Sequence, residues 1–182
     1  MSSLAELIGQ AESNNDYNAY NRGTAGGKIL GAQFKCSLVT SRVSAVLTDM
    51  ALPAANTNRL FAVGRYQLIP TTFKEAVTAL KIDKTALFDE ALQDRILCEY
   101  LLKRKRPHIF DYITGLSNDI KAAALAASQE WASIADPNTG YSHYDNGNVA
   151  SITTAQLNKA LQAARSAYCE QGMTFDKAVF HE

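Results

Sequence analysis

The sequence predicts a mainly α-helical α+β protein with a small β or loop insert after the first helix. Apolar residues recur three and four positions apart in six or seven segments, which is typical of amphipathic helices. The segment from Gly23 to Phe34 instead carries four glycines and cannot form a stable helix. The chain has 182 residues, 47% of them hydrophobic, which is enough for one core. We therefore expect a single domain over residues 1–182.

The first helix is predicted to begin with a capping box formed by Ser3 and Glu6, and to end near residues 13–16. Glu12 lies four residues after Ile8 and eight after Leu4, so it projects from the apolar face of this helix. Burial there would raise the pKa of its carboxyl and keep it protonated near neutrality. The alternative is a glutamate at the rim of that face, reaching solvent as the helix ends.

Two more helices are expected before residue 81. The second covers 43–50, behind Thr40 and Ser41, and Pro53 ends it. The third covers 73–80, with Thr72 and Glu75 as its capping box. Between the first helix and the second, the glycine-rich segment is expected to form a loop or a short hairpin.

Three helices are expected in the second half. The first follows an Asp89 cap and closes on the basic run 103–106, which suits either a solvated helix end or attraction to an anionic polymer. A short helical turn is expected at 110–113. A helix at 119–132 is expected behind a Ser117 cap. Glu130, near the end of that helix, is expected to face solvent or to form a structural pair. The last helix covers 157–168, with Thr153 or Thr154 as its cap and Gly172 after its end.

Charge and cysteine content argue against several classes of protein. Lys and Arg number 18, as do Asp and Glu, and this zero net charge argues against a nucleic-acid partner. Cys36, Cys98 and Cys169 are neither a disulfide framework nor a metal motif, and we expect free thiols and no metal or cofactor. The sequence shows no signal peptide and no apolar stretch that could span a bilayer, so we expect synthesis in the cytoplasm and no membrane insertion.

A polar turn at residues 62–72 is the strongest candidate for ligand contact. Gly64 allows close backbone approach, Tyr66 and Gln67 carry hydrogen-bonding tips, and Pro70 starts a helix. Together with the loops after Glu12 and after residue 131, this turn offers the aromatic and hydrogen-bonding groups that sugars need.

Aromatic residues near residue 131 are further candidates. Trp131, the only tryptophan, suits either the core or a sugar-stacking platform. Tyr141 and Tyr144 follow in a polar loop and are expected at the rim of a binding cleft.

These motifs together resemble the lysozyme-like superfamily of peptidoglycan-cleaving enzymes. Its lytic transglycosylases end a helix with Glu-Ser and follow it with a Gly-x-x-Gln turn, like Glu12-Ser13 and residues 64–67 here. Residues 64–68, together with the segment 131–133 followed by 140–141, are similar to the phage lambda lysozyme group, whose members are lytic transglycosylases. Residues 23–58 depart from that group and are longer.

The resemblance implies roles for the matched residues. Glu12 would protonate the glycosidic oxygen between N-acetylmuramic acid and N-acetylglucosamine. It would then act as base on the muramyl C6 hydroxyl, which closes a 1,6-anhydro ring. Substrate contacts are expected from the remaining candidates: Ser13, Gly64, Tyr66, Gln67, Trp131, Tyr141 and Tyr144.

Other functions stay open. A hydrolytic muramidase usually needs a second carboxylate, for which Asp16 and Asp49 are the candidates. A non-catalytic peptidoglycan-binding module and a chitin-directed glycosidase are further readings. We expect a monomer that reaches the wall either as a phage endolysin or as an exported antibacterial effector, the latter with a cognate immunity protein.

Overall fold

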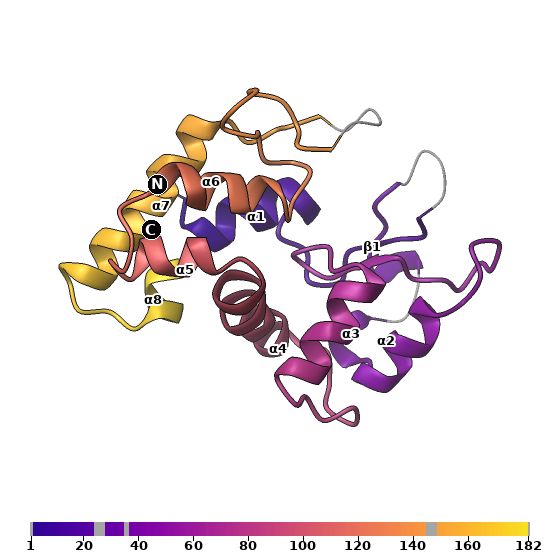
Figure 1. Ribbon diagram of the computed structural model, residues 1–182. Helices are drawn as coiled ribbons and strands as arrows, with labels where there is room; N and C mark the ends of the chain where they lie inside the picture. The colour runs from indigo at the N-terminus through magenta and orange to yellow at the C-terminus, as the bar shows by residue number, and fades with distance from the viewer. Residues whose placement is uncertain (1, 24–27, 35–36, 145–148, 182) are drawn as a thin grey trace. The chain divides into compact units, whose positions relative to one another are not determined.

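The computed structural model describes residues 2–23, 28–34, 37–144 and 149–181, and these are mainly helical with one two-stranded sheet (Figure 1). The predicted α+β, mainly helical class is confirmed. The chain divides into two compact units: a central unit of residues 12–100, and a terminal unit of residues 1–11 with 101–182. Across the described ranges, no helix combines the length and apolar character needed to cross a membrane.

A short antiparallel ribbon organises the start of the central unit. Strand β1 (Tyr20–Asn21) pairs with β2 (Ala62–Val63), and Tyr20 lies opposite Val63. Tyr20 also exchanges two backbone hydrogen bonds with Leu30, at 2.8 and 2.7 Å. The segment that was expected to form a loop or hairpin is therefore joined at residues 20 and 30, and β1 pairs with the distant strand β2. Of the residues singled out in this region, Gly26, Gly27 and Cys36 lie outside the described residues.

Three helical segments complete the central unit: α2 (Val43–Met50), α3 (Pro70–Ala79), and α4 (Glu90–Arg95) with the first half of its π-helical continuation η3 (Ile96–Lys105). From residue 101 onward, η3 belongs to the terminal unit. The short 3₁₀ turns Ala32–Phe34 and Leu38–Thr40 precede α2. The predicted bounds of α2 are confirmed, as is the Asp89 cap, whose carboxylate accepts from the Leu92 N–H at 2.8 Å.

The predicted capping box of α3 is wrong. The helix begins at Pro70, because the fixed φ of proline suits the first helical position, and Ile69 is therefore the N-cap. The Glu75 carboxylate instead accepts from the Tyr100 hydroxyl at 2.8 Å. The ring of Phe73, in α3, packs against the ring of Phe88 in the core of the unit, with centroids 4.9 Å apart.

The terminal unit is built from helices. Helix α1 (Leu4–Ser13) begins in this unit, and its last two residues belong to the central unit. At its start, the Glu6 N–H donates to Ser3 Oγ at 3.2 Å. Figure 1 shows the remaining helices, which are α5 (Pro107–Ile113), α6 (Ile120–Ser128), α7 (Thr154–Cys169) and α8 (Phe175–Val179).

Two helix caps and one basic helix end in this unit can be compared with the sequence predictions. Asp119, not Ser117, caps α6 by accepting from the Ala122 N–H. Thr153 caps α7 in a reciprocal capping box with Gln156. The basic run at the end of η3 is partly neutralised, because the buried Glu130 carboxylate pairs with Lys105 and Arg106 at 3.0 and 2.9 Å.

Candidate functional site

The end of α1 is bonded directly to the Gly64 turn. Glu12 is half-buried in the last turn of the helix, and Ser13, which ends it, is buried. The Ser13 hydroxyl donates to the backbone carbonyl of Arg65 at 2.9 Å, across 52 positions of sequence. The two motifs that carry the resemblance therefore meet inside the central unit.

The turn after β2 is held in shape by backbone bonds and by positive φ angles. Gly64 has φ of +74° and donates its N–H to the Ala19 carbonyl at 2.7 Å. Val63 and Leu68 exchange backbone hydrogen bonds, which closes the turn. Gln67 has φ of +49°, and its half-buried amide donates to the Gly64 carbonyl at 2.9 Å. Gln67 also accepts from the Asn21 amide at 3.2 Å.

Gly64 approaches a protein side chain closely. A Cβ at this position would lie 2.2 Å from Oε1 of Gln93. The glycine is therefore required by packing against Gln93, and its predicted approach to a ligand stays a prediction.

Gln93, in α4, is hydrogen-bonded to the turn, and the sequence analysis did not identify it. Only 1% of it is exposed. Its Oε1 accepts from the Arg65 N–H at 2.9 Å, and its amide donates to the carbonyls of Tyr17 and Phe88 at 3.0 and 3.1 Å. The signal was a polar residue four positions before Leu97 on an apolar helix face, the same signal that singled out Glu12.

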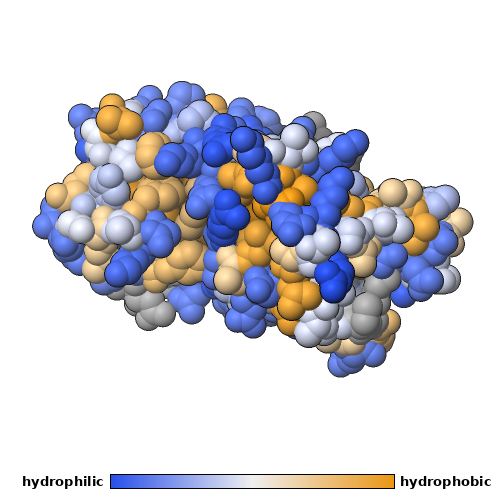
Figure 2. Space-filling view, turned by 90° about the horizontal axis from the view of Figure 1, so that it is seen from below, coloured by the Kyte–Doolittle hydropathy of each residue, from blue (hydrophilic) through white to orange (hydrophobic). Residues whose placement is uncertain are grey.

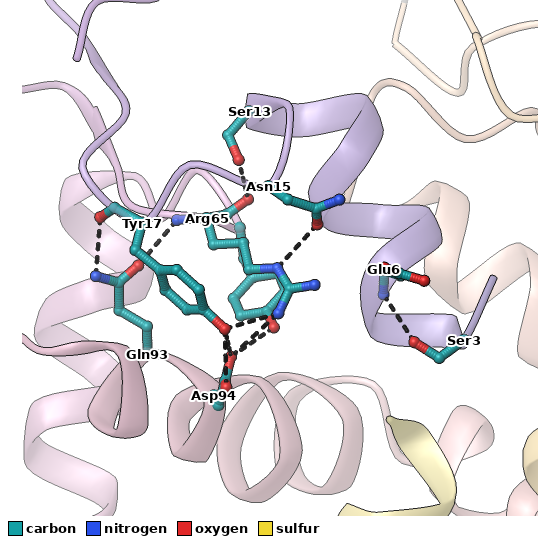
Figure 3. Close-up of polar contacts among 9 residues, drawn as sticks. Ser3, Glu6, Ser13, Asn15, Tyr17, Arg65, Gln93 and Asp94 are labelled. Carbon is teal, nitrogen blue, oxygen red and sulfur yellow. Dashed lines mark hydrogen bonds and ion pairs between the residues drawn. The ribbon is translucent and has the colours of Figure 1, made fainter. Parts of the chain in front are cut away.

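The Arg65 side chain joins the segment after Glu12 to α4 (Figure 3). Its Nε donates to Asn15 Oδ1 at 3.0 Å, and its Nη1 donates to the Tyr17 hydroxyl at 2.7 Å. The same Nη1 lies 3.7 Å from a carboxylate oxygen of Asp94, and only 9% of the Arg65 side chain is exposed. The guanidinium also lies over the rings of Tyr17 and Tyr66, at 5.1 and 5.4 Å from their centroids.

Asp94 receives hydrogen bonds from two phenols. The Tyr66 hydroxyl donates to it at 2.7 Å and the Tyr17 hydroxyl at 3.0 Å. Burial and the neighbouring Asp94 charge raise the pKa of Tyr17 to about 12, and the same causes raise that of Tyr66 further. Both phenols therefore stay protonated, as donors to Asp94, at any physiological pH.

Tyr66 lies in the interior of the site. It is 2% exposed, and its hydroxyl is bonded to Asp94. In this arrangement Tyr66 anchors the turn to the interior through Asp94, and its predicted contact with a sugar stays a prediction.

The candidates near residue 131 belong to the terminal unit. Trp131 is 3% exposed, which favours the core interpretation over the platform. Tyr141 and Tyr144 are exposed, and the Tyr144 hydroxyl donates to the Gln129 carbonyl at 2.6 Å. Their predicted place at the rim of a glycan cleft stays a prediction.

The two acids considered as second carboxylates are in the central unit. Asp16 is exposed and accepts from the Asn18 N–H at 2.8 Å, which is a local turn contact. Asp49 is half-buried in α2, and its carbonyl accepts from the Leu60 N–H. Among the described residues, no group of three or more His, Cys, Asp or Glu side chains could hold a metal ion.

Comparisons of the chain with protein-family models, with curated proteins and with solved structures found no match. The likeness to lysozyme-like enzymes therefore depends on the motif residues alone, of which Glu12, Ser13 and the Gly64 turn are brought together in one unit.

Proposed function

We propose that this protein cleaves the β-1,4 bond between N-acetylmuramic acid and N-acetylglucosamine in peptidoglycan, acting as a lytic transglycosylase. The observation that supports this most is the hydrogen bond from Ser13 to the Arg65 carbonyl. It joins the residue directly after a half-buried glutamate to a polar turn that is far away in sequence. A carboxyl partly removed from water is suited to general acid catalysis at a glycosidic oxygen.

In the proposed reaction, Glu12 donates its proton to the glycosidic oxygen as the bond to the muramyl C1 breaks. The resulting carboxylate then accepts the proton of the muramyl C6 hydroxyl, whose oxygen attacks C1 and closes the 1,6-anhydro ring. One carboxyl thus serves both steps, and no water is consumed. This suits the site, because Asp94, the carboxylate that is bonded to the Gly64 turn through Tyr66, is engaged by two tyrosines and Arg65.

The product distinguishes this reaction from hydrolysis. Purified sacculi are incubated with the protein, and the released muropeptides are analysed by mass spectrometry. We expect muramyl ends lighter by one water than hydrolytic products. Reducing muramyl ends would instead show a hydrolytic muramidase. Retention on sacculi with nothing released would show a peptidoglycan-binding module and contradict the proposed cleavage.

The proposed substrate lies in the cell wall, so the protein must reach it after synthesis. Release as a phage endolysin and export as an antibacterial effector both provide that access. Neighbouring holin genes would favour the endolysin, and neighbouring immunity or secretion genes would favour the effector.

A further inference from the structure

Positive charge is concentrated in the part of the chain that builds the proposed site. Residues 17–74 contain seven Lys and Arg residues but a single acid, Asp49, although the whole chain carries no net charge. Some of these cations are used inside the protein. Arg65 pairs with Asp94, and Arg42 donates to the Thr85 carbonyl.

Two of the cations, Arg22 and Arg59, lie together at one end of the β1–β2 ribbon. Arg22 directly follows β1, and Arg59 precedes β2 by three residues. The Phe61 N–H donates to the Asn21 carbonyl at 2.8 Å, which continues the ribbon to this end. Arg59 Nη1 donates to the Arg22 carbonyl at 3.3 Å, and its guanidinium lies over the Phe61 ring at 5.2 Å.

Neither guanidinium is neutralised within the described part of the chain. No carboxylate there forms an ion pair with Arg22 or Arg59, and the buried Nε of each has no hydrogen-bond acceptor. A buried charged donor without an acceptor costs stability, and in native proteins such groups call for an explanation. Both residues are only half-buried, so part of each side chain is open to a ligand, although Arg59 Nη1 is already bonded to the Arg22 carbonyl.

The arginine pair adjoins the proposed substrate-contacting turn. Arg22 is next to Asn21, whose amide donates to Gln67 in that turn. The sugar rings of the glycan strand are neutral. Its carboxylates are carried on the muramic acid side chain, either on the lactyl group or on the peptide attached to it. A guanidinium binds a carboxylate through two parallel hydrogen bonds, which makes it suited to this group.

We propose that Arg22 and Arg59 form a subsite for a carboxylate carried on the muramic acid side chain. This inference rests on the proposed function and adds to it the part of the substrate that determines recognition. The pair would let the protein distinguish wall glycan from a neutral chitin-type strand.

The test measures binding by titration calorimetry with the Glu12→Gln protein, so that no ligand is consumed. Three ligands are used: a chito-oligosaccharide, glycan fragments with stem peptides, and glycan fragments with free lactyl carboxylates. The Arg22→Gln/Arg59→Gln variant is compared with Arg42→Gln/Arg95→Gln, which removes the same charge from exposed positions of the central unit.

We expect the Arg22/Arg59 variant to bind at least one carboxylate-bearing glycan about ten- to a hundredfold more weakly, because charge-assisted hydrogen bonds are lost. Binding of the chito-oligosaccharide should not change, and the control should bind all three ligands like the parent. Whichever carboxylate-bearing glycan is weakened identifies the lactyl or the peptide carboxylate as the ligand.

Equal affinities of the variant and the parent would overturn the subsite, as would an equal loss in the control. If the parent binds none of the three ligands, the proposed function fails and the subsite with it. The single Arg59→Lys variant guards against misfolding, because it keeps the positive charge and a long side chain while it loses the bidentate guanidinium geometry. It should show a smaller loss than the double variant, and the same affinity as the parent in every ligand would also count against the subsite.

Discussion

At the scale of single residues, the Gly64 turn depends on a glycine with two independent constraints. Its φ of +74° lies in the left-handed region, and a Cβ would collide with Oε1 of Gln93. Gln93 cannot simply move away, because it holds three backbone groups. Any side chain at position 64 therefore disturbs the link between the turn and α4.

Gly64→Ala should destabilise the protein by more than the cost of the backbone angle alone. Gly172→Ala is the matched control, because Gly172 has φ of +68° and nothing within 4 Å of its Cβ position. We expect the Gly64 variant to lose about 1–3 kcal/mol more than the control, owing to overpacking against Gln93. Urea unfolding of both variants measures the difference, and equal losses would show that the Gln93 contact is unimportant.

The two phenols on Asp94 make stability depend on alkaline pH. The folded-state pKa of Tyr17 is raised to about 12, above the unfolded value of about 10. The folded state therefore holds its proton where the unfolded state has lost it. The stabilisation is complete below pH 10 and is lost as pH rises toward 12.

We expect the free energy of unfolding to fall between about pH 10 and pH 12, and to fall less steeply in Tyr17→Phe. Denaturant titrations at several pH values measure both slopes. Other groups also titrate in this range, so the comparison between the two proteins is the informative quantity. Identical pH dependence in the two would contradict the assigned environment of Tyr17.

Residue roles were harder to predict than residue importance. Glu12 and Gly64 stand out in the sequence, since a carboxyl on an apolar helix face and a glycine before polar residues are local signals. Gln93, however, lies 29 positions after Gly64, and nothing in the sequence says that the two touch. Tyr66 was expected to face a sugar because its hydroxyl is polar, whereas that hydroxyl is bonded to Asp94 in the interior.

At the scale of elements, the helices α1 and α4 are connected through Arg65. Its backbone bonds Ser13 and Gln93, and its side chain bonds Asn15 and Tyr17. One residue therefore fixes where the chain runs immediately after Glu12. This makes Arg65 a structural determinant of the proposed site.

Arg65→Met should destabilise the protein substantially. The variant keeps most of the side-chain volume, but it removes the Arg65 hydrogen bonds to Asn15 and Tyr17 and the cation beside Asp94. We expect a loss of about 2 kcal/mol, less than for a fully buried pair because the Asp94 side chain is 28% exposed.

Arg95→Met is the matched control for this measurement. Arg95 pairs with Glu99 at 2.9 Å on the surface, with both side chains about half exposed. Such a pair contributes only about 0.3–0.5 kcal/mol. Thermal or urea unfolding should separate the two variants clearly, and similar stabilities would argue against the Arg65 network.

The helices could be predicted because the period of their apolar residues is a local signal. The ends of the helices were harder to predict. The bounds of α2 and the Asp89 cap follow directly from the sequence pattern. For α3, Pro70 correctly marked the start of the helix, whereas the capping box of Thr72 and Glu75 was wrong because it placed the N-cap inside the first turn. The β1–β2 pairing could not be predicted, since each strand has two residues and its partner is about 40 positions away.

At the scale of the whole molecule, neutral overall charge conceals an uneven distribution. The basic excess of residues 17–74 is offset by acids elsewhere in the chain. The zero net charge argues only against a nucleic-acid partner, whereas the distribution of positive charge along the chain points to an anionic ligand near the proposed site. The face shown in Figure 2 carries hydrophobic residues bordered by hydrophilic ones, so polar groups are present beside the exposed apolar surface.

The most direct measurement of the central claim is the release of soluble glycan from purified sacculi by the unaltered protein, by Glu12→Gln and by Glu6→Gln. Both variants remove one half-buried carboxylate from α1, and Glu6 lies in the first turn of that helix, six residues before Glu12. Circular dichroism and thermal unfolding establish that all three proteins are folded. We predict full release by the unaltered protein and by Glu6→Gln, and a loss of at least about a hundredfold in Glu12→Gln. Release by Glu12→Gln at the rate of the unaltered protein would contradict the account.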